Sequence, residues 1–128
     1  MPAIPDSHRD LLDVPVATLA TVGHDGRPQL SEVWFLVDDD HIRLSLNTSR
    51  QKTKNLQGNP ACGLLILDLG NPRRYIELRG DAVIDPDPDR AFAKKVGAKY
   101  GVDLMTMDKP GESRVVVTVR PVRIRTWG

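Results

Sequence analysis

The stretch SRQKTKNL, residues 49–56, places three cations at alternate positions: Arg50, Lys52 and Lys54. Residues 41–67 contain four Lys or Arg and no Asp or Glu, a local charge of +4 in a chain whose formal net charge is +1. We expect a short helix to begin here, and cations in the first turn of a helix are unfavourable by roughly 0.3–1 kcal/mol each. A bound anion would reverse that penalty, because backbone N–H groups and cationic side chains can hold it together. The pattern therefore makes phosphate the natural candidate ligand.

A solvated basic face is the alternative interpretation of this segment, because charged side chains are mostly exposed to water. A second basic cluster, NPRRY, brings Arg73 and Arg74 to a predicted turn before a strand. Paired arginines at a turn say little by themselves. If both clusters border one cleft, the ligand should be long and carry several negative charges.

The remaining candidates for chemistry are weaker. Trp34 lies on a predicted strand and could cover a flat ring, although packing is the more common role of such an aromatic. His8, His24 and His41 are scattered, without the spacing of a zinc or iron site, so no metal is predicted. We find no P-loop, dinucleotide-binding glycine motif or nucleophile elbow. If the protein is an enzyme, a cofactor is expected to supply the chemistry.

Composition limits the class of protein. The chain has 128 residues, 40% of them hydrophobic and 27% charged, which is typical of one soluble globular domain spanning residues 1–128. The small net charge and six aromatic residues (two each of Phe, Trp and Tyr) argue against an oligonucleotide binder, so no nucleic-acid partner is expected. No apolar run is long enough for a membrane span or a signal peptide. A single cysteine, Cys62, fits a reducing compartment, and we expect a cytoplasmic protein in which this thiol packs in the interior.

The elements that must position these residues are mostly strands. DVPVATLATV and QLSEVWFLV flank Asp25-Gly26, a strong hairpin signal, and HIRLSLN follows as a third antiparallel strand. CGLLILDL, YIELRGDAVI and RVVVTVRPVRIRTW read as further strands, the last with a break at Pro121. A first helix is expected near residues 49–57, capped by Thr48 or Ser49.

A second helix is expected near Pro88–Tyr100, with Asp87 as its N-cap and Pro88 in its first position. The predicted order is therefore βββ-α-ββ-α-β. With so many strands and only two short helices, the economical fold class is mainly β, a closed or half-open antiparallel barrel.

Four segments together resemble the pyridoxamine 5'-phosphate oxidase-like split-barrel superfamily: ATLATVGHDGRPQLSEVWF, LSLNTSRQKTKNLQGNP, RYIELRG and RVVVTVRPVRIRTW. They are most similar to its actinobacterial branch, which uses the deazaflavin coenzyme F-420. The resemblance spans nearly the whole chain, and the combination of DGRPQLS with SRxKTxNL carries most of its specificity. It implies an FMN-binding-type split β-barrel that forms a homodimer, with two cofactor sites at the subunit interface.

The resemblance also implies where the cofactor lies. The deazaflavin would rest against the second strand and the end of the third, the basic motif would hold its phosphate, and residues 73–75 would reach it from the partner subunit. The implied cofactor-binding residues are Pro28, Gln29, Leu30, Ser31, Ser45, Leu46, Asn47, Arg50, Lys52, Thr53, Asn55, Arg73, Arg74 and Tyr75. Catalytic residues stay unassigned, with Tyr75 the one candidate for a general acid. On this interpretation, the anion expected at SRQKTKNL is the phosphate of the coenzyme's tail.

The function implied by the resemblance is that of an oxidoreductase, a reductase that transfers a hydride from reduced coenzyme F-420 to a small organic acceptor. An oxidase of vitamin B6 is not expected, because such enzymes carry arginine and lysine in the strand that reads RPQLSEVWF here. One alternative is an FMN-binding oxidoreductase of the same fold, since the same basic motif would hold the FMN phosphate. Another is a non-catalytic protein that binds the cofactor or haem.

Overall fold

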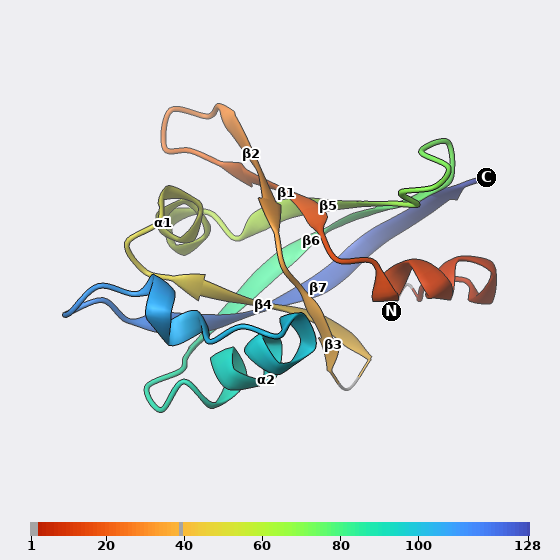
Figure 1. Cartoon of the computed structure of the whole chain (residues 1–128). Helices are drawn as coiled ribbons and strands as arrows, with labels where there is room; N and C mark the ends of the chain where they lie inside the picture. The colour runs from red at the N-terminus through yellow and green to blue at the C-terminus, as the bar shows by residue number, and fades with distance from the viewer. Residues whose placement is uncertain (1–2, 39) are drawn as a thin grey trace.

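The computed structural model describes residues 3–38 and 40–128. Its strands are β1 (Ala17–Val22), β2 (Pro28–Val33), β3 (Leu36–Asp38), β4 (His41–Asn47), β5 (Ala61–Leu67), β6 (Tyr75–Pro86) and β7 (Arg114–Trp127) (Figure 1). Its helices are α1 (Gln51–Gly58) and α2 (Ala91–Tyr100), together with the 3-10 helices η1 (Asp6–Asp13) and η2 (Leu104–Met107). The two 3-10 helices were not predicted.

The strands form one antiparallel sheet in the order β2-β1-β5-β6-β7-β4-β3. The two edge strands, β2 and β3, follow one another in the chain and are separated only by Trp34 and Phe35. The sheet must therefore curl until its edges approach, which makes it a split β-barrel. The predicted barrel class is confirmed.

The prediction of a single strand over QLSEVWFLV was wrong. Residues 34–35 interrupt it, so β2 pairs with β1 and β3 pairs with β4. The backbone of Phe35 is bonded by helix α2 instead of a strand: its N–H donates to the Tyr100 hydroxyl, which donates back to the Phe35 carbonyl, both at 3.1 Å. Lys99 Nζ also donates to that carbonyl at 2.7 Å. These bonds satisfy the backbone N–H and carbonyl groups of Phe35.

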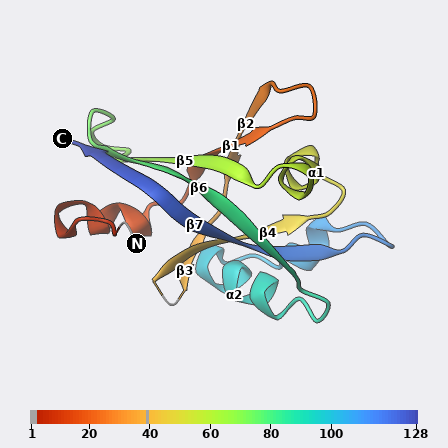
Figure 2. The same cartoon turned by 180° about the vertical axis from the view of Figure 1, so that it is seen from behind.

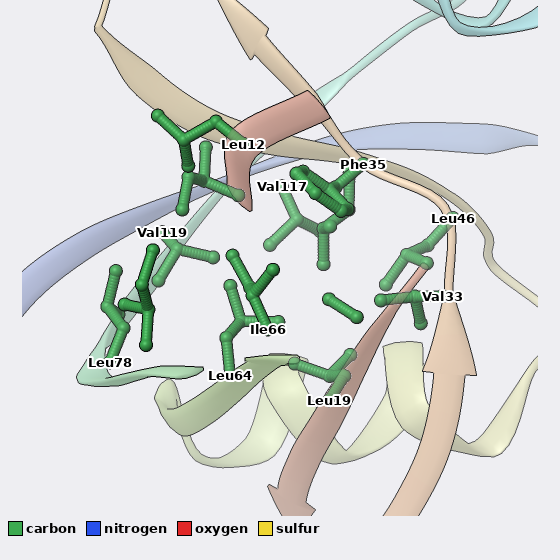
Figure 3. Packing of buried hydrophobic residues seen from close by; sticks show 14 of the residues in the cluster. Leu12, Leu19, Val33, Phe35, Leu46, Leu64, Ile66, Leu78, Val117 and Val119 are labelled. Atoms are coloured by element: carbon green, nitrogen blue, oxygen red, sulfur yellow. The ribbon is translucent and has the colours of Figure 1, made fainter. Parts of the chain in front are cut away.

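The barrel interior is filled by side chains that alternate along the strands (Figure 3). On β4, Ile42, Leu44 and Leu46 are buried, as the alternation of HIRLSLN predicts. Phe35, within the strand break, is fully buried. The core thus extends across the break and supports the chain where it changes pairing partner.

Both helices begin later than predicted. Helix α1 has Arg50 as its N-cap and no side-chain cap, because Ser49 Oγ donates to Asn47 Oδ1 and Thr48 Oγ1 bonds to Ser113. Helix α2 begins at Ala91, after a turn that contains Pro88. Asp87 still serves as a cap, since its carboxylate accepts hydrogen bonds from the N–H groups of residues 92 and 93.

The two ends of the barrel carry different elements. Helix α1 lies at one end, whereas η1 and the C-terminal end of β7 lie at the other (Figures 1 and 2). Strands β6 and β7 pair along their whole length, with a bulge where the partner of Arg79 is Arg123 and the partner of Gly80 is Pro121. The break predicted at Pro121 is therefore a bulge within one long strand.

Candidate functional site

A pocket of about 220 Å³ opens where β2, β4, α1, α2 and η2 meet. Its polar lining consists of Glu32, Ser45, Asn47, Arg50, Lys52 and Arg114. The apolar lining consists of Val33, Trp34, Leu46, Val96, Leu104 and Met107. The pocket therefore combines the basic segment with the end of the third predicted strand, as the resemblance implies.

Arg50 and Lys52 give the pocket its positive charge. Lys52 is half-buried, and burial, followed by the nearby charge of Arg50, lowers the pKa of its ammonium group. No carboxylate of the described residues forms an ion pair with either side chain. Two uncompensated cations that face one pocket make a strong binding site for an anion.

Lys54 faces elsewhere. It lines a separate pocket of about 530 Å³ between α1 and the β1–β2 turn, together with His24 and Gln51. The three alternate cations of SRQKTKNL therefore do not act on one ligand site, because successive positions on a helix point in different directions. This separation makes Lys54 a natural control for Lys52.

Two other residues of the basic motif hold the helix in place. Thr53 is fully buried, and its hydroxyl donates to the Asn47 carbonyl at 2.7 Å. The Asn55 amide donates to Thr21 Oγ1 and Gln29 Oε1, both at 3.0 Å, and accepts from Gln51. Thr53 thus joins α1 to β4, and Asn55 joins it to β1 and β2. Neither side chain lines the pocket.

The side chain of Asn47 also forms hydrogen bonds within the protein. Its amide nitrogen donates to Asp108 Oδ1 at 2.9 Å and to Glu112 Oε1 at 3.2 Å. Its amide oxygen accepts from the backbone N–H and the hydroxyl of Ser49. Asn47 therefore sets the position of the turn that leads to Arg50. It also lines the pocket, so its predicted contact with the cofactor stays a prediction.

The predicted residues of β2 divide between the two faces of the strand. Pro28 and Leu30 lie on the outer face, while Gln29 and Ser31 lie on the same side as the pocket-lining Val33. Ser31 Oγ is buried and has no hydrogen-bond partner among residues 3–38 and 40–128. A buried hydroxyl without a partner is costly. None of the four predicted residues of β2 lines the pocket.

Trp34 forms part of the pocket wall. Its ring stacks on Tyr100 with a centroid distance of 4.3 Å and an interplanar angle of 6°. The expectation that Trp34 packs is confirmed, and the same ring also lines the pocket. Stacking against Tyr100 of α2 holds the orientation of the Trp34 ring.

The second basic cluster is remote from this pocket within one chain. Arg74 donates to both oxygens of Asp10, at 2.7 and 2.9 Å, and to Asp68 at 3.3 Å. Tyr75 begins β6 and pairs with Trp127 near the C-terminus. Neither these two residues nor Arg73 lines the pocket. The two clusters therefore do not border one cleft in a single chain.

An apolar surface covers the outer face of β1, β2, β5 and β6. It surrounds a shallow cavity of about 780 Å³ whose lining includes Leu30 and, from β7, Val122; these two residues are 68% and 65% exposed. Cys62 lines this cavity and packs against the core, and burial, followed by the charge of Asp81, raises the pKa of its thiol to about 11. The thiol is half-buried and poorly ionised, which agrees with the predicted packing role.

Sequence reasoning missed Arg114 and Asp108. Arg114 begins β7 and lines the pocket, and Asp108, which lies in the loop after η2, is its ion-pair partner at 2.9 Å. No motif marks the pair, because loop DLMTMDKPGE has the composition of an ordinary turn. The one available signal was a charged residue at the start of the apolar run RVVV.

Residues 4–128 match the pyridoxamine 5'-phosphate oxidase family. The chain belongs to this family. Among solved structures, an F-420 reductase is 37% identical to it, with a TM-score of 0.82 over 95% of this chain and 98% of that one. A conserved hypothetical protein from Mycobacterium tuberculosis is 27% identical, with a TM-score of 0.79 over 98% and 85% of the two chains.

The fold of the pyridoxamine 5'-phosphate oxidase family also occurs in the haem storage protein from Vibrio cholerae. That protein is 15% identical, with a TM-score of 0.77 over 99% of this chain and 96% of that one, a likeness that shows the fold alone. In the present chain, residues 3–38 and 40–128 contain no group of three His, Cys, Asp or Glu placed to hold a metal ion. None of its described helices is long and apolar enough to cross a membrane.

Proposed function

We propose that the protein is a coenzyme F-420-dependent oxidoreductase that reduces a small organic acceptor. The observation that carries the proposal is the pocket in which Arg50 and Lys52, without carboxylate partners among the described residues, lie beside the ring of Trp34 and strand β4. The 37% identity with an F-420 reductase over nearly the whole of both chains supports the choice of cofactor.

The residues present fit such a cofactor. Arg50 and Lys52 offer charge-assisted hydrogen bonds to a phosphate, and anion binding would relieve the cost of holding Lys52 charged in a half-buried position. When bound, the reduced deazaflavin supplies a hydride to an electron-poor acceptor. The chain itself binds and orients the reactants.

The proton for this reaction is proposed to come from solvent. Tyr75, the one side chain considered from sequence as a general acid, does not border the pocket within its own chain. Glu32 lines the pocket, but its carboxylate already accepts a hydrogen bond from Thr18 at 2.6 Å. An exposed pocket mouth lets water supply the proton without a dedicated residue.

We also propose a homodimer, in which the apolar outer face of β1, β2, β5 and β6 packs against a second copy. An apolar patch with large side chains as exposed as Leu30 and Val122 is typical of a protein–protein interface. Twofold symmetry would create two equivalent sites, and it would let Arg73 or Tyr75 of the partner subunit approach the pocket. Light scattering of a monomer of about 14.2 kDa with cofactor bound would contradict this part of the proposal.

The function is tested by titrating the purified protein with coenzyme F-420, FMN and haemin, and following fluorescence or absorbance. The expected result is tight binding of coenzyme F-420, with much weaker binding of the other two. Tight binding of FMN alone would instead assign a flavin oxidoreductase, and tight binding of haemin alone would assign a haem protein. Transfer of a hydride from the reduced coenzyme is then assayed with a panel of electron-poor alkenes and quinones.

A further inference from the structure

Arg114 is a pocket residue whose guanidinium is only partly used by the protein. It is 8% exposed and pairs with Asn47 in the register of β4 and β7. Its Nε donates to both oxygens of Asp108, at 3.0 and 2.9 Å, and its Nη1 donates to the carbonyl and hydroxyl oxygens of Ser45 at 3.4 and 3.2 Å. Its Nη2 donates to no acceptor among residues 3–38 and 40–128. Two N–H donors of a buried side chain are therefore left for the pocket.

Asp108 holds this guanidinium in position. Its side chain is 4% exposed, and it accepts hydrogen bonds from Arg114, from Asn47 at 2.9 Å and from Arg90 at 3.3 Å. Burial alone would raise the pKa of Asp108, but the hydrogen bonds from Arg114 and Asn47 outweigh it and lower the pKa. The carboxylate therefore stays ionised at neutral pH and fixes the plane of the guanidinium.

The cationic side chains of the pocket differ in whether a carboxylate pairs with them. Arg50 and Lys52 have no carboxylate partner in the described part of the chain, so they present net positive charge, which suits a phosphate. Arg114 forms an ion pair with Asp108, which Arg90 also contacts at 3.3 Å, so the charge of Arg114 is compensated in part, unlike the charges of Arg50 and Lys52. Its guanidinium also reaches back along β4 to Ser45, away from the turn that bears Arg50. A neutral acceptor on a ring fits this end of the pocket better than a phosphate does.

We propose that Arg114 is a ligand-binding residue that donates hydrogen bonds from Nη2 to a carbonyl oxygen or ring nitrogen of the cofactor's ring system, and that Asp108 is the positioning residue that orients it. This assignment rests on the proposed function, because it takes the pocket as the cofactor site. The chemistry is shared by deazaflavin and flavin rings, both of which carry such acceptors.

The test compares ligands with and without the phosphate. The probes are coenzyme F-420 and its phosphate-free deazaflavin riboside, with FMN and riboflavin as the second pair. Arg114→Lys keeps a cation beside Asp108 but removes the guanidinium group and its Nη2 donors. It is expected to weaken binding of both members of a pair by the same factor, about tenfold or more, because the lost contact is to the ring. Lys52→Met is the matched control, which should weaken only the phosphate-bearing member.

Asp108→Asn is the second variant and leaves the arginine in place. It is expected to weaken binding of the riboside as well, because an amide cannot accept both contacts from Nε and hold the guanidinium plane. Melting temperatures establish that each variant is folded. A folded Arg114→Lys protein with unchanged riboside affinity would overturn the assignment, and so would unchanged affinity in Asp108→Asn if the first variant does not fold.

The outcome for the wild type separates this inference from the proposed function. If the wild type binds the flavin pair and not the deazaflavin pair, the proposed function is wrong, and the same two variants test Arg114 with FMN and riboflavin. If the wild type binds neither pair, both the proposed function and the role of Arg114 are wrong.

Discussion

Replacing Lys52 with methionine removes one cationic donor from the pocket and keeps an unbranched apolar stem of similar length. Lys52 is half-buried, lines the pocket beside Arg50, and forms no ion pair within the described residues. A hydrogen bond to a charged group contributes about 1.5–3 kcal/mol, which corresponds to a loss of affinity of roughly 10- to 150-fold. We expect coenzyme F-420 binding to weaken by that factor, as measured by fluorescence titration.

The change should not destabilise the fold. The pKa of Lys52 is lower in the folded protein than its ordinary value of 10.5, so folding disfavours the charged form. At neutral pH, well below that ordinary value, the lysine is charged in the unfolded chain, and its burial in the folded state opposes stability. Lys52→Met is therefore expected to melt at the same temperature as the wild type or higher, which a thermal unfolding curve measures.

Salt dependence identifies the group that Lys52 contacts. Exposed charge pairs are screened within about 10 Å at 0.1 M salt, so wild-type affinity should fall as salt is added, and less steeply in Lys52→Met. Lys54→Met is the matched control, because it removes the same charge two positions away and faces a different pocket. Equal salt slopes in the wild type and Lys52→Met, or equal losses in the two variants, would refute the placement of the phosphate.

Three further predictions concern the scaffold and the thiol. Gly97→Ala should lower the free energy of unfolding by about 1–3 kcal/mol, measured with urea, because an added Cβ would overlap the carbonyl oxygen of Val102; an unchanged midpoint would show that the loop moves freely. Thr53→Val should cost about 1–3 kcal/mol by the same measurement, because it removes a buried hydrogen bond to Asn47, and an equally stable variant would contradict the structural role assigned to Thr53. Cys62, with its pKa raised to about 11 from 9.0, should react with iodoacetamide at pH 7.5 about a hundredfold more slowly than in the urea-unfolded chain, and equal rates would show that it is exposed.

Local patterns predicted much of the fold because their causes are local. Alternation in HIRLSLN placed Ile42, Leu44 and Leu46 inside the barrel, and Asp25-Gly26 marked the β1–β2 turn, where Gly26 has a φ of 81° that favours glycine. The capping role of Asp87 was also predicted from sequence, although its helix begins later. In each case the residues that predict an element lie in that element or within a few positions of it.

The candidate site was predicted in part. The concentration of positive charge at Arg50 and Lys52 is visible in the sequence, because no acid lies nearby in the chain to neutralise it. The sequence does not show that Lys54 and Arg74 lie away from this pocket. Lys54 faces another pocket, and Arg74 pairs with Asp10 at the far end of the barrel. Which charges meet depends on which segments the fold brings together.

The sequence by itself determined the strands, their inward faces and the basic turn before α1, because hydrophobic alternation, turn residues and charge runs act over short distances along the chain. Tertiary structure alone decided that residues 34–35 separate two strands, since side chains of helix α2 bond the backbone of Phe35 there. It also decided the pairing of Arg114 with Asp108 and the hydrogen bond that Asn47 donates to Asp108, a contact that spans 61 positions in the sequence. A buried ion pair forms where the folded chain excludes water, and no local pattern records which distant residues will share that space.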